Sequence, residues 1–179
     1  MRKWVVLSAL IAIVVFVVTS VRAEELRIAV IDVNRVLNEC AEGKAAKEKM
    51  KDRYKELQSK LEKEQDKLKK FKEEIDKNKI VLGEEKVKEK EAEFRKKMEE
   101  FRKLVAESEK EMRDRESTYT KEILKKIRKK VDAYVKENGI DLVLDVSGGV
   151  VYAKDSLDIS DKIKEILDRE YRENANKGK

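Results

Sequence analysis

The most constraining feature of the sequence is a long charged segment that carries a heptad repeat of apolar residues. Residues 45–138 are almost entirely Lys, Glu and Arg with spaced apolar side chains, and no proline interrupts them. From Met50 the chain alternates steps of four and three, and Glu64 is the only polar residue of this first series. The series consists of Met50, Tyr54, Leu57, Leu61, Glu64, Leu68, Phe71 and Ile75. This spacing is typical of coiled coils, so we expect helices that pair along these positions, which we call the seam.

The repeat is interrupted once, at residues 78–84, which include Gly83. Glycine adopts left-handed backbone conformations that a Cβ would penalise, so Gly83 suits a reversal of the chain. The same stepping resumes at Val87. The sequence therefore predicts an antiparallel helical hairpin over residues 45–118, with its tip at 78–84 and a length of about 50 Å at 1.5 Å per residue.

Short β-rich segments flank this hairpin. Residues 26–31 and 140–146 are rich in Ile, Val and Leu, which favours strands. The turn residues 147–149 and a second apolar run at 150–153 follow, and this order predicts an antiparallel β-hairpin. A last helix is expected to end near Tyr171.

The predicted fold class is therefore α+β, with a small β-rich base and a long antiparallel coiled-coil hairpin. The base consists of residues 24–44 and 119–173, and residues 174–179 are expected to form a disordered tail. A core of this size is marginal alone, and its sheet edges are open. Oligomerisation through the base would cover both deficits.

The first 23 residues have the character of a secretory signal peptide. A basic start precedes an apolar run over residues 4–18, and small residues precede a predicted cut after Ala23. The alternative is an uncleaved anchor, since residues 4–21 are about long enough to span a thin bilayer. Both place the rest of the chain across the membrane. The segment carries three basic and no acidic residues, so its removal lowers the formal net charge from +6 to +3.

Composition argues against an enzyme and against a nucleic-acid partner. The chain has no histidine and one cysteine, Cys40, which excludes His-based triads, His metal sites and an intrachain disulfide framework. A mature charge of +3 with interleaved signs is a weak nucleic-acid signal. Asp155, Asp158 and Asp161 do not match a calcium loop and are expected to cap helices. Cys40 is expected to be buried, the alternative being an interchain disulfide.

The mature chain, with its charged helical hairpin between short β-rich ends, resembles the Skp/OmpH family over essentially its whole length. The resemblance lies in the order of the segments rather than in any one motif, and no proline stands where the family has one after Tyr152. The matching segments are IAVIDVNRVL (28–37), GKAA (43–46), NGIDLVLD (138–145), VYA (151–153) and LDIS (157–160).

The resemblance implies a periplasmic holdase chaperone. Members of the family form trimers through a β-rich base, and three helical hairpins, or tentacles, enclose a cavity. Unfolded outer-membrane β-barrel proteins are held there without ATP. The chain has no GxxxxGK[ST] loop for a nucleotide, and no cofactor is expected.

The candidate client-binding residues lie on the seam and at the tip. They are Phe71, Ile75, Ile80, Val81, Leu82, Val87, Phe94 and Met98. Seam residues first of all pack the two helices together, but a two-helix hairpin cannot bury a broad stripe, and Phe and Met at its flanks stay adaptable. The apolar run 80–82 either staples the helix ends together or contacts the client.

The base contains candidates for an oligomer interface, which the sequence does not separate from core residues. They are Ile28, Val30, Leu142, Leu144 and Val151. The lysine runs at 67–72 and 86–90 are expected to form a solvated face, the alternative being contact with anionic lipid or lipopolysaccharide.

The alternative function is a structural coiled-coil spacer or tether in the cell envelope. If the protein is a tether, the seam should be fully buried and unfolded proteins should not bind. If it is a holdase, it should bind unfolded proteins stoichiometrically, without nucleotide and in a salt-sensitive way. A cytosolic prefoldin-like chaperone would share the hairpins, but the predicted leader argues against it.

Overall fold

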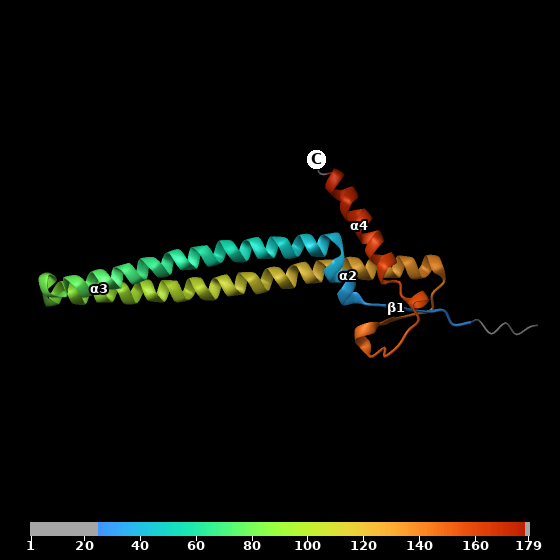
Figure 1. The fold of residues 1–179 in the computed structure, drawn as a ribbon, viewed down its shortest axis with the longest axis horizontal. Helices are drawn as coiled ribbons and strands as arrows, with labels where there is room; N and C mark the ends of the chain where they lie inside the picture. Colours follow the sequence, from blue (N-terminus) through green and yellow to red (C-terminus); the bar gives the residue numbers. More distant parts are fainter. Residues whose placement is uncertain (1–24, 178–179) are drawn as a thin grey trace, which may run out of the picture.

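The computed structural model describes residues 25–177, and the predicted signal peptide lies outside them. Figure 1 shows a long helical hairpin that projects from a small base, which the N-terminal and C-terminal segments of the described chain form together. In chain order the elements are β1 (Ile28–Ile31), α2 (Val33–Glu39), α3 (Ala41–Asn138), β2 (Leu142–Asp145), the 3-10 turns η1 (Val146–Gly148) and η2 (Asp155–Leu157), and α4 (Ser160–Lys177).

The element α3 consists of two helical arms joined at Gly83, as the heptad break predicts. Gly83 is non-helical, with φ 78° and ψ 160°, a region that only glycine occupies readily. The arms run antiparallel (Figure 1), and the ion pair between Lys90 and Glu74, at 3.3 Å, joins them near the tip. Along the seam the buried apolar side chains are Leu57, Leu68, Ile75 and Val87. The helical-hairpin prediction is confirmed.

The sheet differs from the prediction. β1 and β2 pair in parallel, with Ile28 opposite Leu142 and Ile31 opposite Asp145. Residues 150–153 form no strand, so the antiparallel β-hairpin expected there is wrong. The parallel pairing presents one face of the sheet, including Ala29 and Ile31, to the core beneath the helices. Because this burial stabilises the fold, β2 pairs with β1 and not with the neighbouring apolar run at residues 150–153.

The core of the base is formed by one face of the sheet, α2, α4 and the root of α3. Ile163 of α4 and Val36 of α2 are among its most deeply buried side chains. Cys40 is also buried, as expected, and its Sγ accepts a hydrogen bond from the Gly43 N–H at 3.3 Å at the start of α3. Burial raises the pKa of the Cys40 thiol.

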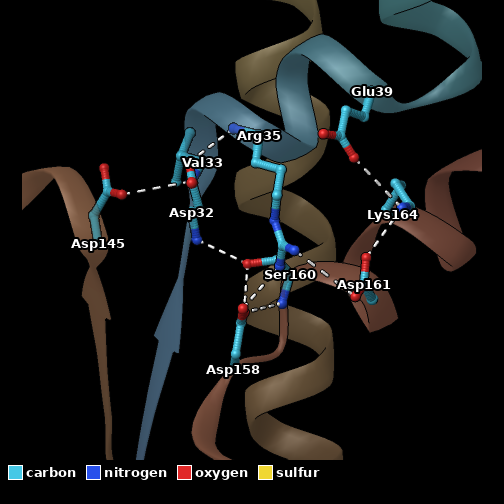
Figure 2. A network of polar contacts seen from close by, with 9 residues as sticks. All are labelled: Asp32, Val33, Arg35, Glu39, Asp145, Asp158, Ser160, Asp161 and Lys164. Atoms are coloured by element: carbon cyan, nitrogen blue, oxygen red, sulfur yellow. Dashed lines mark hydrogen bonds and ion pairs between the residues drawn. The ribbon is translucent and has the colours of Figure 1, made fainter. Parts of the chain in front are cut away.

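A polar network locks the start of α4 to the start of α2 (Figure 2). The Asp32 carboxylate caps α2 by accepting from the Arg35 N–H at 2.8 Å, and the Asp32 N–H donates to Ser160 Oγ at 2.8 Å. Arg35 reaches across to Asp158 at 2.7 Å. Asp158 also accepts from the Ser160 N–H at 2.8 Å, which agrees with its expected capping role.

α4 is longer than the sequence suggested, since it continues to Lys177. Residues 174–177 are therefore helical rather than part of a disordered tail. The reason lies in contacts that hold the middle of α4 against α3. Asp168 accepts a hydrogen bond from the Ala41 N–H at 2.6 Å, and Glu170 forms an ion pair with Lys130.

Candidate client-binding and self-association surfaces

The tip of the hairpin presents two apolar side chains to solvent. Ile80 is 97% exposed and Val81 is 85% exposed, whereas Leu82 beside them is half-buried. By contrast, Ile75 and Val87 are buried between the arms. The tip therefore offers Ile80 and Val81 to a partner, while Ile75 and Val87 hold the helix ends together and have no free surface in this conformation.

A half-buried aromatic pair lies next along the hairpin. The ring centroids of Phe71 and Phe94 are 6.5 Å apart, and the rings are tilted by 31°. The Nζ atoms of Lys90 and Lys97 lie over the Phe71 ring at 5.3 Å and 5.7 Å from its centroid. An ammonium group is attracted to the face of an aromatic ring, so the two lysine side chains partly shield the Phe71 ring from solvent. The candidate Met98 is also half-buried.

A groove of about 630 Å³ runs along the hairpin below this pair. Its apolar lining comes from both arms, and lysine and glutamate side chains form its rim. The lining residues are Lys60, Glu64, Lys67, Leu68, Lys70, Phe71, Glu74, Lys97, Glu100, Phe101 and Leu104. The sequence analysis did not single out this groove, although Glu64 on the seam was a signal for it.

Nearer the base, an ionic cluster braces the two arms. Arg53 of the first arm donates two hydrogen bonds to the Glu111 carboxylate, at 2.7 and 2.9 Å, and Arg115 donates a third at 2.7 Å. Hydrogen bonds from Arg53 and then Arg115 lower the pKa of Glu111 to about 2. Glu111 therefore stays ionised at any neutral or mildly acidic pH.

The lysine runs are balanced only in part by acidic neighbours. Lys67 pairs with Glu64 at 2.7 Å, Lys72 with Asp76 at 3.1 Å, and Lys90 with Glu74 at 3.3 Å. The other lysines of the two runs have no carboxylate within ion-pair distance among the described residues, and all of these lysines lie on the solvated faces of the arms.

The base carries an exposed apolar face. Ile28, Leu142 and Leu144 are each about two-fifths exposed, and Val151 projects fully into solvent. Ile28 lies opposite Leu142 in the sheet register, so the two side chains share the face turned away from the core. Val30 is buried and is thus a core residue of the single chain.

Further apolar side chains extend this face beyond the residues that the sequence singled out. The largest is Tyr152, which is 81% exposed beside Val151. The available signal was the apolar run at 150–153, which the sequence analysis interpreted as a strand and which forms none in the structure.

Within the described residues, no cluster of three or more potential metal ligands is present. In residues 25–177, no helix combines the length and apolar character that a membrane span requires.

Comparisons with known proteins place this geometry in context. No curated protein matches the chain significantly. A Caulobacter crescentus CB15 protein assigned as an OmpH-like outer membrane chaperone has a similar crystal structure, with a TM-score of 0.76 and 17% sequence identity. The similarity covers 80% of this chain and 84% of that one. The family model for outer membrane protein (OmpH-like) matches residues 27–167, which include the whole hairpin and most of the base. The chain belongs to the OmpH-like family.

Proposed function

We propose that this protein is an ATP-independent periplasmic holdase that binds unfolded outer-membrane β-barrel proteins and prevents their aggregation. The observation that carries the proposal is the tip, where Ile80 and Val81 are almost fully exposed far from the core of the base. Exposed apolar residues with no packing role are typical of sites that bind apolar partners. Membership of the OmpH-like family supports the same function.

Self-association is the second part of the proposal. The apolar face with Ile28, Leu142, Leu144 and Val151 would be covered by further copies of the chain, which would complete a base too small to be stable alone. The resemblance to the Skp/OmpH family makes a homotrimer the expected assembly. Three hairpins fixed at one end would then enclose a cavity for the client.

The distribution of charge suits capture and release without nucleotide. Each arm of the hairpin carries ion pairs between residues of the same helix, for example Lys103 with Glu99 at 3.0 Å, so the outer faces of the arms stay hydrated. Apolar contact with a client is offered by the tip, by the half-buried Phe71, Phe94 and Met98, and by the groove. A client held by such scattered contacts can leave when a more stable folded state becomes available.

The test is to dilute a urea-unfolded outer-membrane β-barrel protein into buffer with and without the exported, processed protein, and to follow light scattering. We expect suppression at about one client per oligomer, without ATP. The double variant Ile80→Ser, Val81→Ser should lose most of this effect. Tyr54→Ser is the matched control, because Tyr54 is exposed on the same hairpin but lies near its root.

Aggregation at the same rate at every ratio would contradict the holdase proposal. A coiled-coil spacer or tether in the envelope would then be the better account, since the buried seam residues also suit a stiff rod. Analytical ultracentrifugation tests self-association separately, and a monomer at micromolar concentration would contradict the assembly.

A further inference from the structure

The groove between the arms has an identifiable cause in the sequence. Glu64 occupies a seam position, where its half-buried side chain lines the groove and pairs with Lys67 at 2.7 Å. A hydrated, ion-paired carboxylate at a seam position packs less closely between the helices than an apolar side chain would. Leu68, Phe101 and Leu104 consequently line an open depression instead of a closed seam.

The dimensions of the groove suit an extended polypeptide. Its lining residues on the first arm run from Lys60 to Glu74. This distance is about 21 Å at 1.5 Å per helical residue. An extended chain advances about 3.3 Å per residue, so roughly six residues fit along the groove. Alternate side chains of such a segment point to one face, and an apolar face would meet the floor formed by Phe71, Phe101 and Leu104.

The charges at the rim restrict the polar face of that segment. Lys67 and Lys97 are occupied by Glu64 and Glu93, at 2.7 and 3.3 Å. Lys60 and Lys70, near the two ends, have no carboxylate within ion-pair distance among the described residues. Glu100 is likewise without a cation in the described chain, so two free lysines face one free glutamate at this groove. The excess positive charge therefore favours an occupant with carboxylates.

Lys60 and Lys70 are separated by about 15 Å along the helix. Two residues four apart in an extended chain are separated by about 13 Å, which brings one carboxylate near each lysine.

We infer that the groove between the arms is a binding subsite for extended, amphipathic segments of polypeptide that carry acidic residues four positions apart and apolar residues between them. The inference rests on the proposed holdase function and names which part of a client this site takes. Specificity comes from the apolar floor and the end lysines, and the opening is maintained by Glu64.

The probe is a fluorescein-labelled peptide with the pattern Asp-Tyr-Thr-Leu-Asp, compared with the same peptide carrying Lys in place of both Asp residues. Binding to the exported, processed protein is followed by fluorescence anisotropy. We expect the acidic peptide to bind at least about tenfold more tightly than the basic one, with a difference that shrinks as salt is added.

Two matched pairs of variants test the groove. Lys60→Glu with Lys70→Glu should weaken peptide binding by about tenfold or more. Lys63→Glu with Lys69→Glu makes the same change in net charge on the same arm, but these lysines are exposed and do not line the groove, so binding should be retained.

The second pair alters the seam. Glu64→Leu should close the groove, abolish peptide binding and raise the urea midpoint of unfolding, because an apolar seam residue packs better. Glu91 follows Val87 by one step of four and is therefore a seam position of the second arm, but it does not line the groove. Glu91→Leu makes the same change there and should leave peptide binding intact.

Equal binding by both lysine double variants, or full binding by Glu64→Leu, would overturn the inference. Binding of dodecyl phosphate without binding of the acidic peptide would assign the groove to a lipid-like amphiphile and would overturn it too. If the peptide does not bind while aggregation of the β-barrel client is still suppressed, the groove subsite fails and the holdase function stands. If the peptide binds and the client nevertheless aggregates, the holdase function fails instead.

Discussion

Replacement of Gly83 by alanine isolates the backbone conformation that reverses the chain. An alanine Cβ at this position would have no heavy atom within 4 Å, so the substitution creates no clash. The whole cost comes from the backbone, because φ 78° with ψ 160° is a region that residues with a Cβ rarely adopt. Such strain costs about 1–3 kcal/mol. This corresponds to a change of about 5- to 150-fold in the equilibrium between the closed and the opened tip.

The assay is amide hydrogen exchange over residues 78–88, combined with urea unfolding followed by circular dichroism at 222 nm. We expect Gly83→Ala to accelerate exchange at the tip by about that factor, with a smaller shift of the urea midpoint, since the strain can be released by local opening. Gly148→Ala is the matched control. Its added Cβ also meets nothing within 4 Å, and its φ is not positive.

The control should change stability by less than about 1 kcal/mol. If Gly83→Ala and Gly148→Ala have the same exchange rates at the tip and the same urea midpoint, the backbone at Gly83 is not held in the left-handed half of φ space, and the reasoning is refuted.

Three further predictions concern the arms and the base. Ile163→Ala removes a fully buried side chain from the core of the base and should lower the free energy of unfolding by about 2–5 kcal/mol in urea titrations, and a loss under about 1 kcal/mol would contradict the packing described. Glu111→Gln should destabilise the hairpin at neutral pH but not at pH 2, because the folded-state pKa of Glu111 is lowered to about 2 by Arg53 and Arg115; its contribution is complete above the unfolded value near 4.5 and is lost as the pH falls through 2. Stability curves of the two proteins that stay parallel down to pH 2 would refute this. Cys40 should resist Ellman's reagent at pH 8 in the folded protein and react within minutes in 6 M guanidinium, because burial raises its pKa and blocks access, and fast labelling of the folded form would contradict the burial.

The parts of the fold that local patterns encode were predictable from the sequence. The heptad stepping from Met50 and its break at Gly83 report on neighbours a few residues apart, and the hairpin follows from them directly. The cap of Asp32 on α2 is likewise a local signal.

The pairing of the strands was not predictable in the same way. Residues 140–146 and 150–153 are separated by a good turn, so local reasoning joined them into a β-hairpin. The actual partner of β2 is β1, which lies on the other side of the entire hairpin in the sequence. Only the burial of Ala29 and Ile31 beneath the helices explains this choice, and that burial depends on tertiary packing.

The candidate surfaces show a similar division. The apolar run 80–82 stood out in the sequence, but whether it packs between the helix ends or faces a client stayed open, and the structure shows that Ile80 and Val81 are exposed. The groove was not foreseen, since a single polar residue on the seam, Glu64, indicates a weak point but not which side chains of the opposite arm will line it. Phe101 and Leu104 enter that lining through the register of the two arms, and the register becomes visible only in the folded hairpin.

The parallel pairing of β1 with β2 also constrains the order in which the molecule can fold. Closing a flexible loop as long as α3 is entropically costly and slow. Contacts across the turn, such as the ion pair of Lys90 with Glu74 and the aromatic pair of Phe71 with Phe94, link residues that are close in sequence, so we expect them to form early. Pairing can then spread along the seam from the tip, and each further turn brings the two roots of α3 nearer to each other. We therefore expect the hairpin to form first and to bring β1 close to β2, and the base to assemble last.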